Sequence, residues 1–424
     1  MRSTIDLAMK GSENKDTAEF QTQLLEFLMA LGKALIAAGI SVVDINSILE
    51  RVASAYKVKA EVLIFPTVLL VKLGETESST LTAGNQKPEL LPLNQVSELY
   101  ELIHQAENAE ISPKKGKRCV KQILAEKHLF GPLGIIVGYT LFSMGIGMLM
   151  QFSLKQILTS GIFGIIVSFL IIFGEKKQKL SLLIPVIASL VVSSLFFWSL
   201  KLGLIAGSFI MLIPSLAYFL PGAVLTTGML ELASGEIISG SSRVISGAAI
   251  LLLLLFGLII GLETAGLPLQ QLMFLSPPST SIWWIPYIGV LVFGIGMYLF
   301  MSIKKRDMPW ILFILYLAFI GEQAGNHFVG GFFGGFLGSL LMAVTGTLAE
   351  RQGHQTPSFI SILPAFWILV PGSLGFISLA TLVGQNYPAA ITNALLVTMS
   401  IVAISLGLLV GAVVMEPLKD RKVI

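Results

Sequence analysis

The chain has 424 residues, of which 54% are hydrophobic and 12% charged, with a formal net charge of +3. A soluble globular chain carries roughly 25% charged residues, so this composition excludes a protein that is dissolved in water along its whole length. Residues 1–129 contain 31 Asp, Glu, Lys or Arg, whereas the 282 residues from 130 to 411 contain only 17. The first stretch can be soluble, and the second needs a membrane.

Several functional classes find no support in the sequence. The first 20 residues are polar and lack the apolar region of a signal peptide, so we expect the first domain to stay in the cytoplasm. One cysteine, Cys119, is too few for a disulfide framework or a Cys-rich metal site. No basic run interleaved with aromatic residues indicates nucleic acid, and no G-x4-G-K-[ST] motif indicates ATP. We therefore expect no cofactor, no metal and no nucleic-acid partner.

The N-terminal region predicts a small α+β domain over residues 19–129, behind a disordered tail over residues 1–18. Apolar residues follow helical spacing from Phe20 to Ile36, where Gly39 predicts the end of the helix and Ser41 an N-cap for the next one. That second helix should end near Tyr56. Strands are expected at 61–66, 67–73 and 78–83, and further helices at 92–106 and 113–127.

The remaining chain predicts about ten transmembrane helices, because a bilayer span needs about 20 mostly apolar residues. The expected spans are 131–151, 157–173, 181–200, 203–221, 244–262, 282–302, 309–322, 326–349, 359–381 and 388–411. They form a first membrane repeat over 130–265 and a second over 280–411, followed by a cytoplasmic tail over 412–424.

Lysine and arginine in the short loops predict the orientation. With residues 1–129 inside, only Lys155 and Lys201 fall on the opposite side of the membrane. This bias predicts that both termini are cytoplasmic and that the number of spans is even. We expect a multi-pass protein of the cytoplasmic (inner) membrane.

Three motifs recur at nearly one spacing. IPSLAYFLPG (213–222) and LPAFWILVPG (363–372) both read apolar-Pro-x6-Pro-Gly and lie 150 residues apart. GIGM recurs at an offset of 149 (145–148 and 294–297), and Gly-Glu at an offset of 147 (174–175 and 321–322). The sequence therefore predicts a duplicated unit of five helices. Because five is odd, the two units must be inverted relative to each other, which is the plan of secondary transporters with a site near the midplane.

The stretch FLMALGKALIAAGISVVDINSILERVASAY, followed by Pro66-Thr67, resembles the start of the threonine/serine exporter family. PGAVLTTGMLELASGEIISGSSR and GGFFGGFLGSLLMAVTGTLAERQGHQTPSFISILPAFWILVPGS are similar to that family's membrane halves. The resemblance covers residues 20 to about 411. In some relatives the two halves are separate polypeptides, and some of those export dicarboxylates such as succinate.

The resemblance implies a secondary exporter of small polar metabolites, first threonine and serine, that works as an antiporter driven by the proton gradient. A dicarboxylate exporter and a membrane-anchored enzyme with a catalytic N-terminal domain stay open as alternatives. The expected partners are a small-molecule substrate (an amino acid or a carboxylate), protons and the lipid bilayer. Whether the chain forms a homo-oligomer is left open.

Prolines and glycines of the repeated motif are the predicted substrate-binding residues. Proline removes a backbone donor, and a helix broken at Pro-Gly exposes N–H groups that suit a substrate carboxylate. The alternative interpretation is an ordinary packing kink. The residues are Pro214, Pro221, Gly222, Pro364, Pro371 and Gly372.

Three ionisable residues are candidates for proton coupling. Glu322 and His327 lie between the seventh and eighth predicted spans, in a segment that an outer loop would also explain. Glu231 lies after Pro221-Gly222, where the family often has Asp, and an ion pair with Arg243 is the competing interpretation. In the N-terminal domain Asp44, Glu50, His104 and residues 78–80 are the conceivable catalytic set, but no G-x-S-x-G motif accompanies them.

Overall fold

The computed structural model describes residues 2–65, 68–74, 80–85, 91–175, 183–273, 282–330, 332–351, 357–369 and 371–415, with side chains at all of these except 2–18, 80–85, 175, 272, 273, 351 and 371. Contacts divide the chain into two compact units. The first unit comprises Met1–Lys127 and Glu231–Ser239, and the second comprises His128–Leu230 and Gly240–Ile424.

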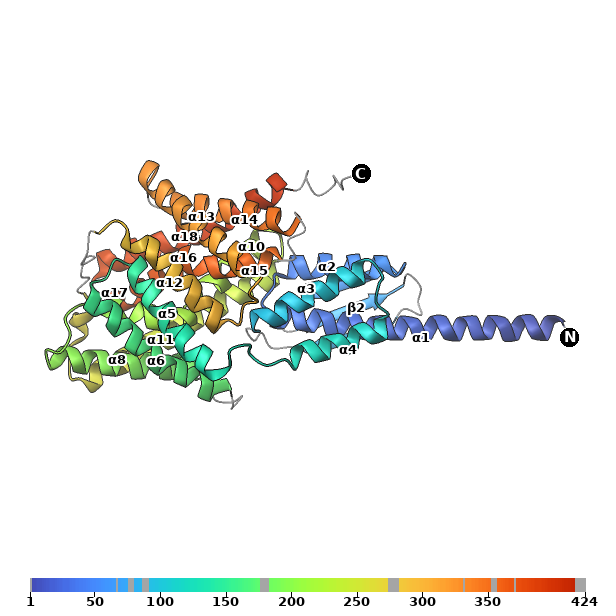
Figure 1. The fold of residues 1–424 in the computed structure, drawn as a ribbon, viewed down its shortest axis with the longest axis horizontal. Helices are drawn as coiled ribbons and strands as arrows, with labels where there is room; N and C mark the ends of the chain where they lie inside the picture. Colours follow the sequence, from blue (N-terminus) through green and yellow to red (C-terminus); the bar gives the residue numbers. More distant parts are fainter. Residues whose placement is uncertain are drawn as a thin grey trace. The chain divides into compact units, whose positions relative to one another are not determined.

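The first unit contains four helices and a three-stranded sheet (Figure 1). Its elements are α1 (Arg2–Ala37), α2 (Val42–Ala55), β1 (Ala60–Ile64), β2 (Val68–Leu73), β3 (Thr80–Asn85), α3 (Leu93–Glu107) and α4 (Pro113–Leu124). The helix α1 begins at Arg2, whereas we expected a disordered tail over residues 1–18. No proline interrupts residues 2–18, so the backbone can continue the helix to the N-terminus.

The end of α1 and the start of α2 are as predicted. Gly39 has a φ of +79°, a left-handed conformation that ends a helix at little cost for glycine. The side-chain oxygen of Ser41 accepts the N–H of Asp44 at 3.2 Å, which caps α2. The local sequence therefore determines this corner of the domain.

The sheet is an antiparallel meander in the order β1-β2-β3, with Ala60 opposite Leu73 and Val68 opposite Asn85. The expected break at Pro66-Thr67 lies outside the described residues. In β2 every second residue is buried, as a strand with one face on a core requires. The core is built from the apolar face of α1 (Leu24, Phe27, Leu28, Leu31 and Leu35), all fully buried, together with α2 and α3.

The second unit is helical. Its long helices are α5 (Gly131–Leu149), α6 (Leu154–Glu175), α8 (Ile184–Lys201), α11 (Ile237–Thr264), α13 (Met308–Phe328), α14 (Phe333–Arg351) and α18 (Tyr387–Met415), and α12 (Ile285–Phe300) is shorter. Of the described residues, eight helical segments are long and apolar enough to cross a membrane, or nine if one bent pair counts as a span. All ten segments that we predicted contain helix. The number of spans that meet this criterion is nevertheless eight or nine, because one segment is bent and α12 has only 16 residues.

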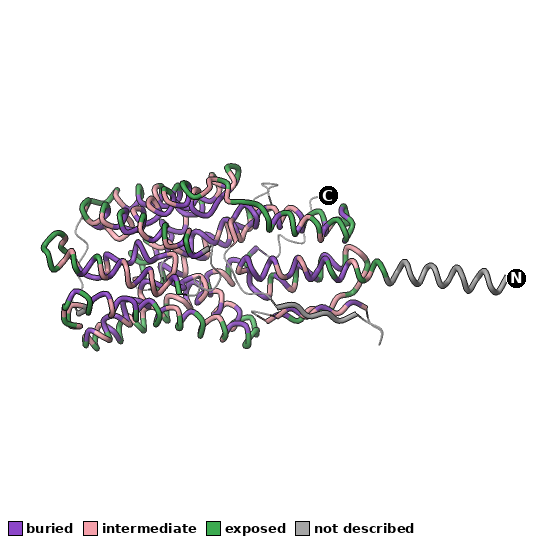
Figure 2. The backbone as a smooth tube through the Cα atoms, turned by 90° about the horizontal axis from the view of Figure 1, so that it is seen from below, coloured by how far each residue is buried: buried purple, intermediate pink, exposed green. Residues whose placement is uncertain are grey.

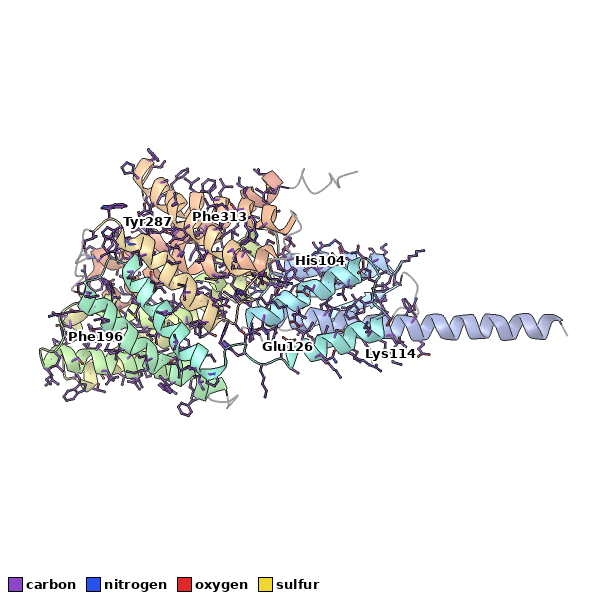
Figure 3. The ribbon with its side chains drawn as sticks, in the orientation of Figure 1. His104, Lys114, Glu126, Phe196, Tyr287 and Phe313 are labelled. Atoms are coloured by element: carbon purple, nitrogen blue, oxygen red, sulfur yellow. The ribbon has the colours of Figure 1, made fainter. Side chains whose placement is uncertain are left out.

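Large apolar side chains cover much of the second unit's surface. Leu133, Ile245 and Val413 are 64–72% exposed, and green exposed positions alternate with purple buried ones along the helices in Figure 2. Tyr287 on α12 and Phe313 on α13 are exposed, whereas Phe196 on α8 is fully buried (Figure 3). An apolar surface of this extent requires lipid as its solvent, and the chain is a multi-pass membrane protein.

Helices α5 and α12 lie side by side and antiparallel, with reciprocal contacts. Gly145 on α5 lies against the backbone of Phe293, and Gly296 on α12 lies against the backbone of Phe142. Each of these two glycines therefore meets a phenylalanine of the other helix. Only glycine permits so close an approach of two backbones.

The pairs α8–α11 and α14–α18 make the same contacts. A side chain at Gly257 would meet the carbonyl oxygen of Val186 at 2.7 Å, and one at Gly407 would meet that of Phe336. Both pairs of residues are exactly 150 positions apart in the chain. One helical turn further on, Gly261 lies against Ser193 and Gly411 lies against Ala343. These two contacts are again 150 positions apart.

Candidate functional site

The first Pro-x6-Pro-Gly segment is a broken helix. It runs through η1 (Phe209–Leu212), α9 (Ile213–Leu216), η2 (Ala217–Phe219) and α10 (Gly222–Ala233), and the two parts are bent by 60°. At the break Leu220 is extended, with φ −68° and ψ 122°. Proline disfavours the helical conformation of the residue before it, so Pro221 holds Leu220 extended and separates the two parts.

The second segment is irregular at the corresponding place. It consists of α15 (Ser358–Ile362), η4 (Leu363–Ala365), α16 (Phe366–Leu369) and α17 (Pro371–Val383), and residue 370 lies outside the described residues. Pro371 occupies the first position of α17, where the N–H that proline lacks would have no partner within the helix. The segment Ser358–Val383 passes as one candidate span.

The two segments meet around a cavity inside the second unit. A side chain at Gly372 would lie 2.9 Å from the backbone nitrogen of Gly222, so the two Pro-Gly positions touch. The cavity is lined by Ile146, Ile213, Ala217, Leu220, Gly222, Ala223, Phe366, Trp367, Gly372 and Ser373. Its volume of about 20 Å³ holds about one water molecule. An amino acid would fit only if the two segments moved apart.

Side chains also bond backbone carbonyl groups of the first segment near the break. The indole N–H of Trp367 donates to the carbonyl oxygen of Ala217 at 3.0 Å, across the two segments. The hydroxyl of Tyr139 on α5 donates to the carbonyl oxygen of Ser215 at 2.7 Å. Buried carbonyl groups are costly without a donor, so these bonds stabilise the broken backbone.

The start of α10 offers donors next to the cavity. The N–H of Gly222 bonds Leu220 and that of Leu225 bonds Pro221, whereas the amides of Ala223 and Val224 have no partner among the described residues. One turn beyond Gly222, the buried hydroxyl of Thr226 has no partner either, within the described part of the chain. Free amides at a helix N-terminus attract a carboxylate.

The structure places two of the six residues predicted to bind substrate in the lining of the cavity. Gly222 and Gly372 line it, but Pro214, Pro221 and Pro364 do not. The prolines act on the backbone instead, and Pro371 starts α17. Sequence reasoning missed Ala217, Trp367 and Ser373. Trp367 lies 150 residues after Ala217, which is also the offset between the two Pro-Gly segments. Aligning the two segments could therefore have drawn attention to Trp367, because its large side chain stands where the first segment has an alanine.

Glu322 and His327 lie within α13, and the outer loop that we considered for them is not found. The helix extends to Phe328, beyond the predicted span of 309–322. Glu322 is half-buried, His327 is exposed, and neither lines the cavity. Five residues apart on a helix, their side chains point to different faces. The backbone of Glu322 and the side chain of Leu369 in the second Pro-Gly segment nevertheless both lie beside Gly338 on α14.

Glu231 is fully buried and belongs to the first unit. Its carboxylate accepts the N–H of Val42 at 3.0 Å. Val42 is the first residue of α2, whose amides have no partner within the helix, so Glu231 caps this helix from a distant part of the chain.

His128 links the ends of α5 and α12. Its Nε2 lies 2.9 Å from the carbonyl oxygen of Phe300, and its Nδ1 accepts the N–H of Phe130 at 3.3 Å. Only a neutral ring with its proton on Nε2 makes both bonds. Burial lowers the pKa of His128 and outweighs the opposite effect of the Phe300 carbonyl. Nearby, the hydroxyl of Ser302 accepts the N–H of Leu129 at 2.8 Å.

The conceivable catalytic residues of the N-terminal domain have structural partners. Asp44 accepts the hydroxyl of Ser41 at 2.6 Å, and Glu50 accepts the amide of Asn46. His104, labelled in Figure 3, lies 3.7 Å from Glu107. Burial alone would raise the pKa of Glu107, but hydrogen bonds from His104 and Arg51 hold it below its ordinary value.

Residues 78 and 79 lie outside the described residues, and no group of three or more His, Cys, Asp or Glu that could hold a metal ion occurs among the described ones.

Comparisons with known proteins match this chain to one family and to several membrane proteins. Residues 26–265 match the ThrE family, described as "Putative threonine/serine exporter". The chain is also similar to Pheromone-regulated membrane protein 10 of Candida glabrata (24% identical over 92% of this chain), Eremothecium gossypii (25% over 82%) and Saccharomyces cerevisiae strain YJM789 (24% over 82%). It spans about half the length of these relatives: 52%, 48% and 46%.

No solved structure matches the chain. The matched region covers more than half of the chain, including the capped α1–α2 corner, the whole sheet and the first Pro-Gly segment. The chain therefore belongs to the ThrE threonine/serine exporter family.

Proposed function

We propose that this protein is a proton-driven secondary exporter of threonine and serine, and that it binds its substrate in the cavity between the two Pro-x6-Pro-Gly segments. The observation that carries the proposal is the meeting of these two segments around one cavity, with Gly222 and Gly372 in contact. The family match supports the substrate class.

The lining of the cavity favours a zwitterion over a dicarboxylate. None of the ten lining residues is charged. Placing an uncompensated dianion in such surroundings would cost several kcal/mol per charge, whereas a zwitterion brings no net charge. Its carboxylate can bind the free amides of Ala223 and Val224, each bond contributing on the order of 1.5–3 kcal/mol.

Equivalent contacts at an offset of 150 residues support a duplication of the membrane helices. Gly257 on Val186 and Gly407 on Phe336 are one such pair. In the same register Glu322 corresponds to Ile172 rather than to Glu175. The Gly-Glu match at an offset of 147 therefore falls almost one turn out of register.

The antiparallel packing of α5 on α12 supports an inverted arrangement of the two repeats. Two equivalent helices that pack antiparallel are related by a two-fold axis perpendicular to both. If these helices cross the membrane, that axis lies in the membrane plane, as in inverted-repeat transporters.

Transport requires the site to open to each side in turn. The cavity holds one water, so the two Pro-Gly segments must separate to admit an amino acid and close again behind it. We place both termini in the cytoplasm, on the distribution of Lys and Arg in the loops. Glu322 is our first candidate for the proton carrier, because it is a half-buried carboxylate in a membrane helix with no partner among the described residues.

Purified protein in liposomes loaded with labelled threonine or serine tests the proposal. We expect efflux of both that is accelerated by an inwardly directed proton gradient and stopped by a protonophore. Preference for succinate would favour the dicarboxylate alternative. Absence of any amino-acid transport would refute the proposal.

A further inference from the structure

Trp367 is the largest side chain at the cavity, and it is a position at which the two Pro-Gly segments differ strongly in size. It stands at the position that Ala217 occupies in the first segment, 150 residues earlier. Its ring lines the cavity and meets the ring of Phe142 edge-on, with centroids 6.3 Å apart. A tryptophan in this place removes space from a site that must admit an amino acid.

The carbonyl group of Ala217 has both of its acceptor positions filled. The N–H of Leu220 bonds it at 3.2 Å within the first segment, and the indole N–H of Trp367 bonds it at 3.0 Å from the second. A carbonyl oxygen has two lone pairs, so a third donor can bind only by displacing one of these two. The Leu220 bond is part of the backbone turn, which leaves the indole as the donor that can leave.

We infer that the indole N–H of Trp367 occupies the position of the substrate's ammonium group. Substrate entry exchanges the indole for the ammonium at the Ala217 carbonyl and moves the ring out of the cavity. The carbonyl thus keeps a donor in both arrangements, and the empty site stays closed by a bond between the two segments. This inference rests on the proposed transport of amino acids and names the group that recognises their amine.

The test compares Trp367→Phe with the wild type in liposomes. Phenylalanine keeps an aromatic ring in the cavity but has no N–H, so the substrate no longer competes with a hydrogen bond. We expect the KM for threonine to fall about 2- to 10-fold, the worth of one neutral hydrogen bond. Trp198→Phe, at an exposed position outside the cavity, is the matched control and should leave KM unchanged.

A competitor without an ammonium group separates amine recognition from packing. The probe is 3-hydroxybutyrate, which has the carboxylate and hydroxyl of threonine but no amine. Its inhibition constant should change less than about twofold in Trp367→Phe, because it does not need the Ala217 carbonyl. Trp367→Ala should in addition admit larger amino acids.

An unchanged or higher KM for threonine in Trp367→Phe, or an equal gain for 3-hydroxybutyrate, would overturn the inference while the proposed function stands. If the wild type moves neither threonine nor serine, the proposed function itself fails before any variant is compared.

Discussion

The two Pro-x6-Pro-Gly segments have the same spacing of prolines but different backbones. The first is bent by 60° at an extended Leu220, whereas the second passes as one candidate span from Ser358 to Val383. The first presents the small Ala217 to the cavity, and the second presents Trp367. The shared motif therefore determines where the two segments meet. The residues between the prolines determine which side chains each segment presents to the cavity.

Outside these segments, glycine contacts recur at an offset of 150 residues. The pairs α8–α11 and α14–α18 share these contacts residue by residue, and α5 and α12 approach each other closely at Gly145 and Gly296. The glycine contacts of these helix pairs are thus equivalent, whereas the two Pro-Gly segments differ in the residues that they contribute to the cavity. Four predictions test this contrast, beginning with the largest expected effect.

Gly372→Ala should reduce export at least about tenfold. The added methyl group would lie 2.9 Å from the backbone nitrogen of Gly222, which cannot rotate away, and overpacking of this kind costs about 1–3 kcal/mol. Gly375→Ala, one turn further along α17, is the matched control, since its methyl group would meet side chains rather than backbone: Leu251 at 3.0 Å and Val397 at 3.7 Å. Initial rates of threonine efflux measure both. Equal rates in the two variants would mean that the contact between the segments does not matter for transport.

Pro221→Ala should reduce export more than Pro371→Ala. Without Pro221, Leu220 can become helical and the 60° bend can straighten, whereas Pro371 sits at a helix start where alanine changes little. We expect a loss of about 5- to 10-fold for Pro221→Ala and less than about twofold for Pro371→Ala. These estimates assume about 1 kcal/mol for the lost preorganisation. A larger loss for Pro371→Ala would reverse the assignment of the break to the first segment.

Gly145→Ala and Gly296→Ala should each destabilise the protein by about 1–3 kcal/mol, because the added methyl group would meet the backbone of the facing helix, at Phe293 and Phe142 respectively. Gly147→Ala is the control, as its methyl group would find ordinary contacts at 3.5 Å or more. Thermal unfolding in detergent compares the three. Unchanged stability in both variants would contradict the close approach of the two backbones.

His128→Asn should weaken the pH dependence of stability, the smallest of the four effects. The pKa of His128 is lowered in the folded protein, so at pH above 6.5 the ring is neutral in both states and costs nothing. As the pH falls below 6.5, the unfolded chain takes up the proton first and the wild type loses stability. Melting temperatures between pH 7.5 and 5 should fall less steeply in the variant. An identical slope would show that the ring titrates normally.

Much of the fold follows from local sequence. Gly39 and Ser41 specify the α1–α2 corner through a left-handed φ and an N-cap, which depend only on neighbouring residues. The apolar runs predict a multi-pass membrane protein, because the solvent of 20 consecutive apolar residues can only be lipid. The extent of α13 was underestimated, since its polar end from Glu322 to Phe328 does not resemble a membrane helix.

The site was predictable only in part. Two recurring Pro-Gly pairs pointed to Gly222 and Gly372, because a repeat of a helix-breaking motif is visible in the sequence itself. Glu322 and His327 were proposed for their charge, and the structure places neither at the cavity. Glu231 was proposed for the same reason, and its carboxylate accepts the N–H of Val42 at the start of α2. A charge in a sequence says that a residue needs a partner but not which one.

By itself, the sequence determined that a polar domain precedes a long series of apolar helices and that two Pro-x6-Pro-Gly segments lie 150 residues apart. These properties depend on composition and on neighbours along the chain. Tertiary structure alone decided that the two Pro-Gly segments touch and that Trp367 bonds the carbonyl of Ala217, 150 residues away in the chain. It also decided that the resulting cavity holds a single water. The packing of helices fixes such distances, because it joins residues whose separation along the chain carries no information about their separation in space.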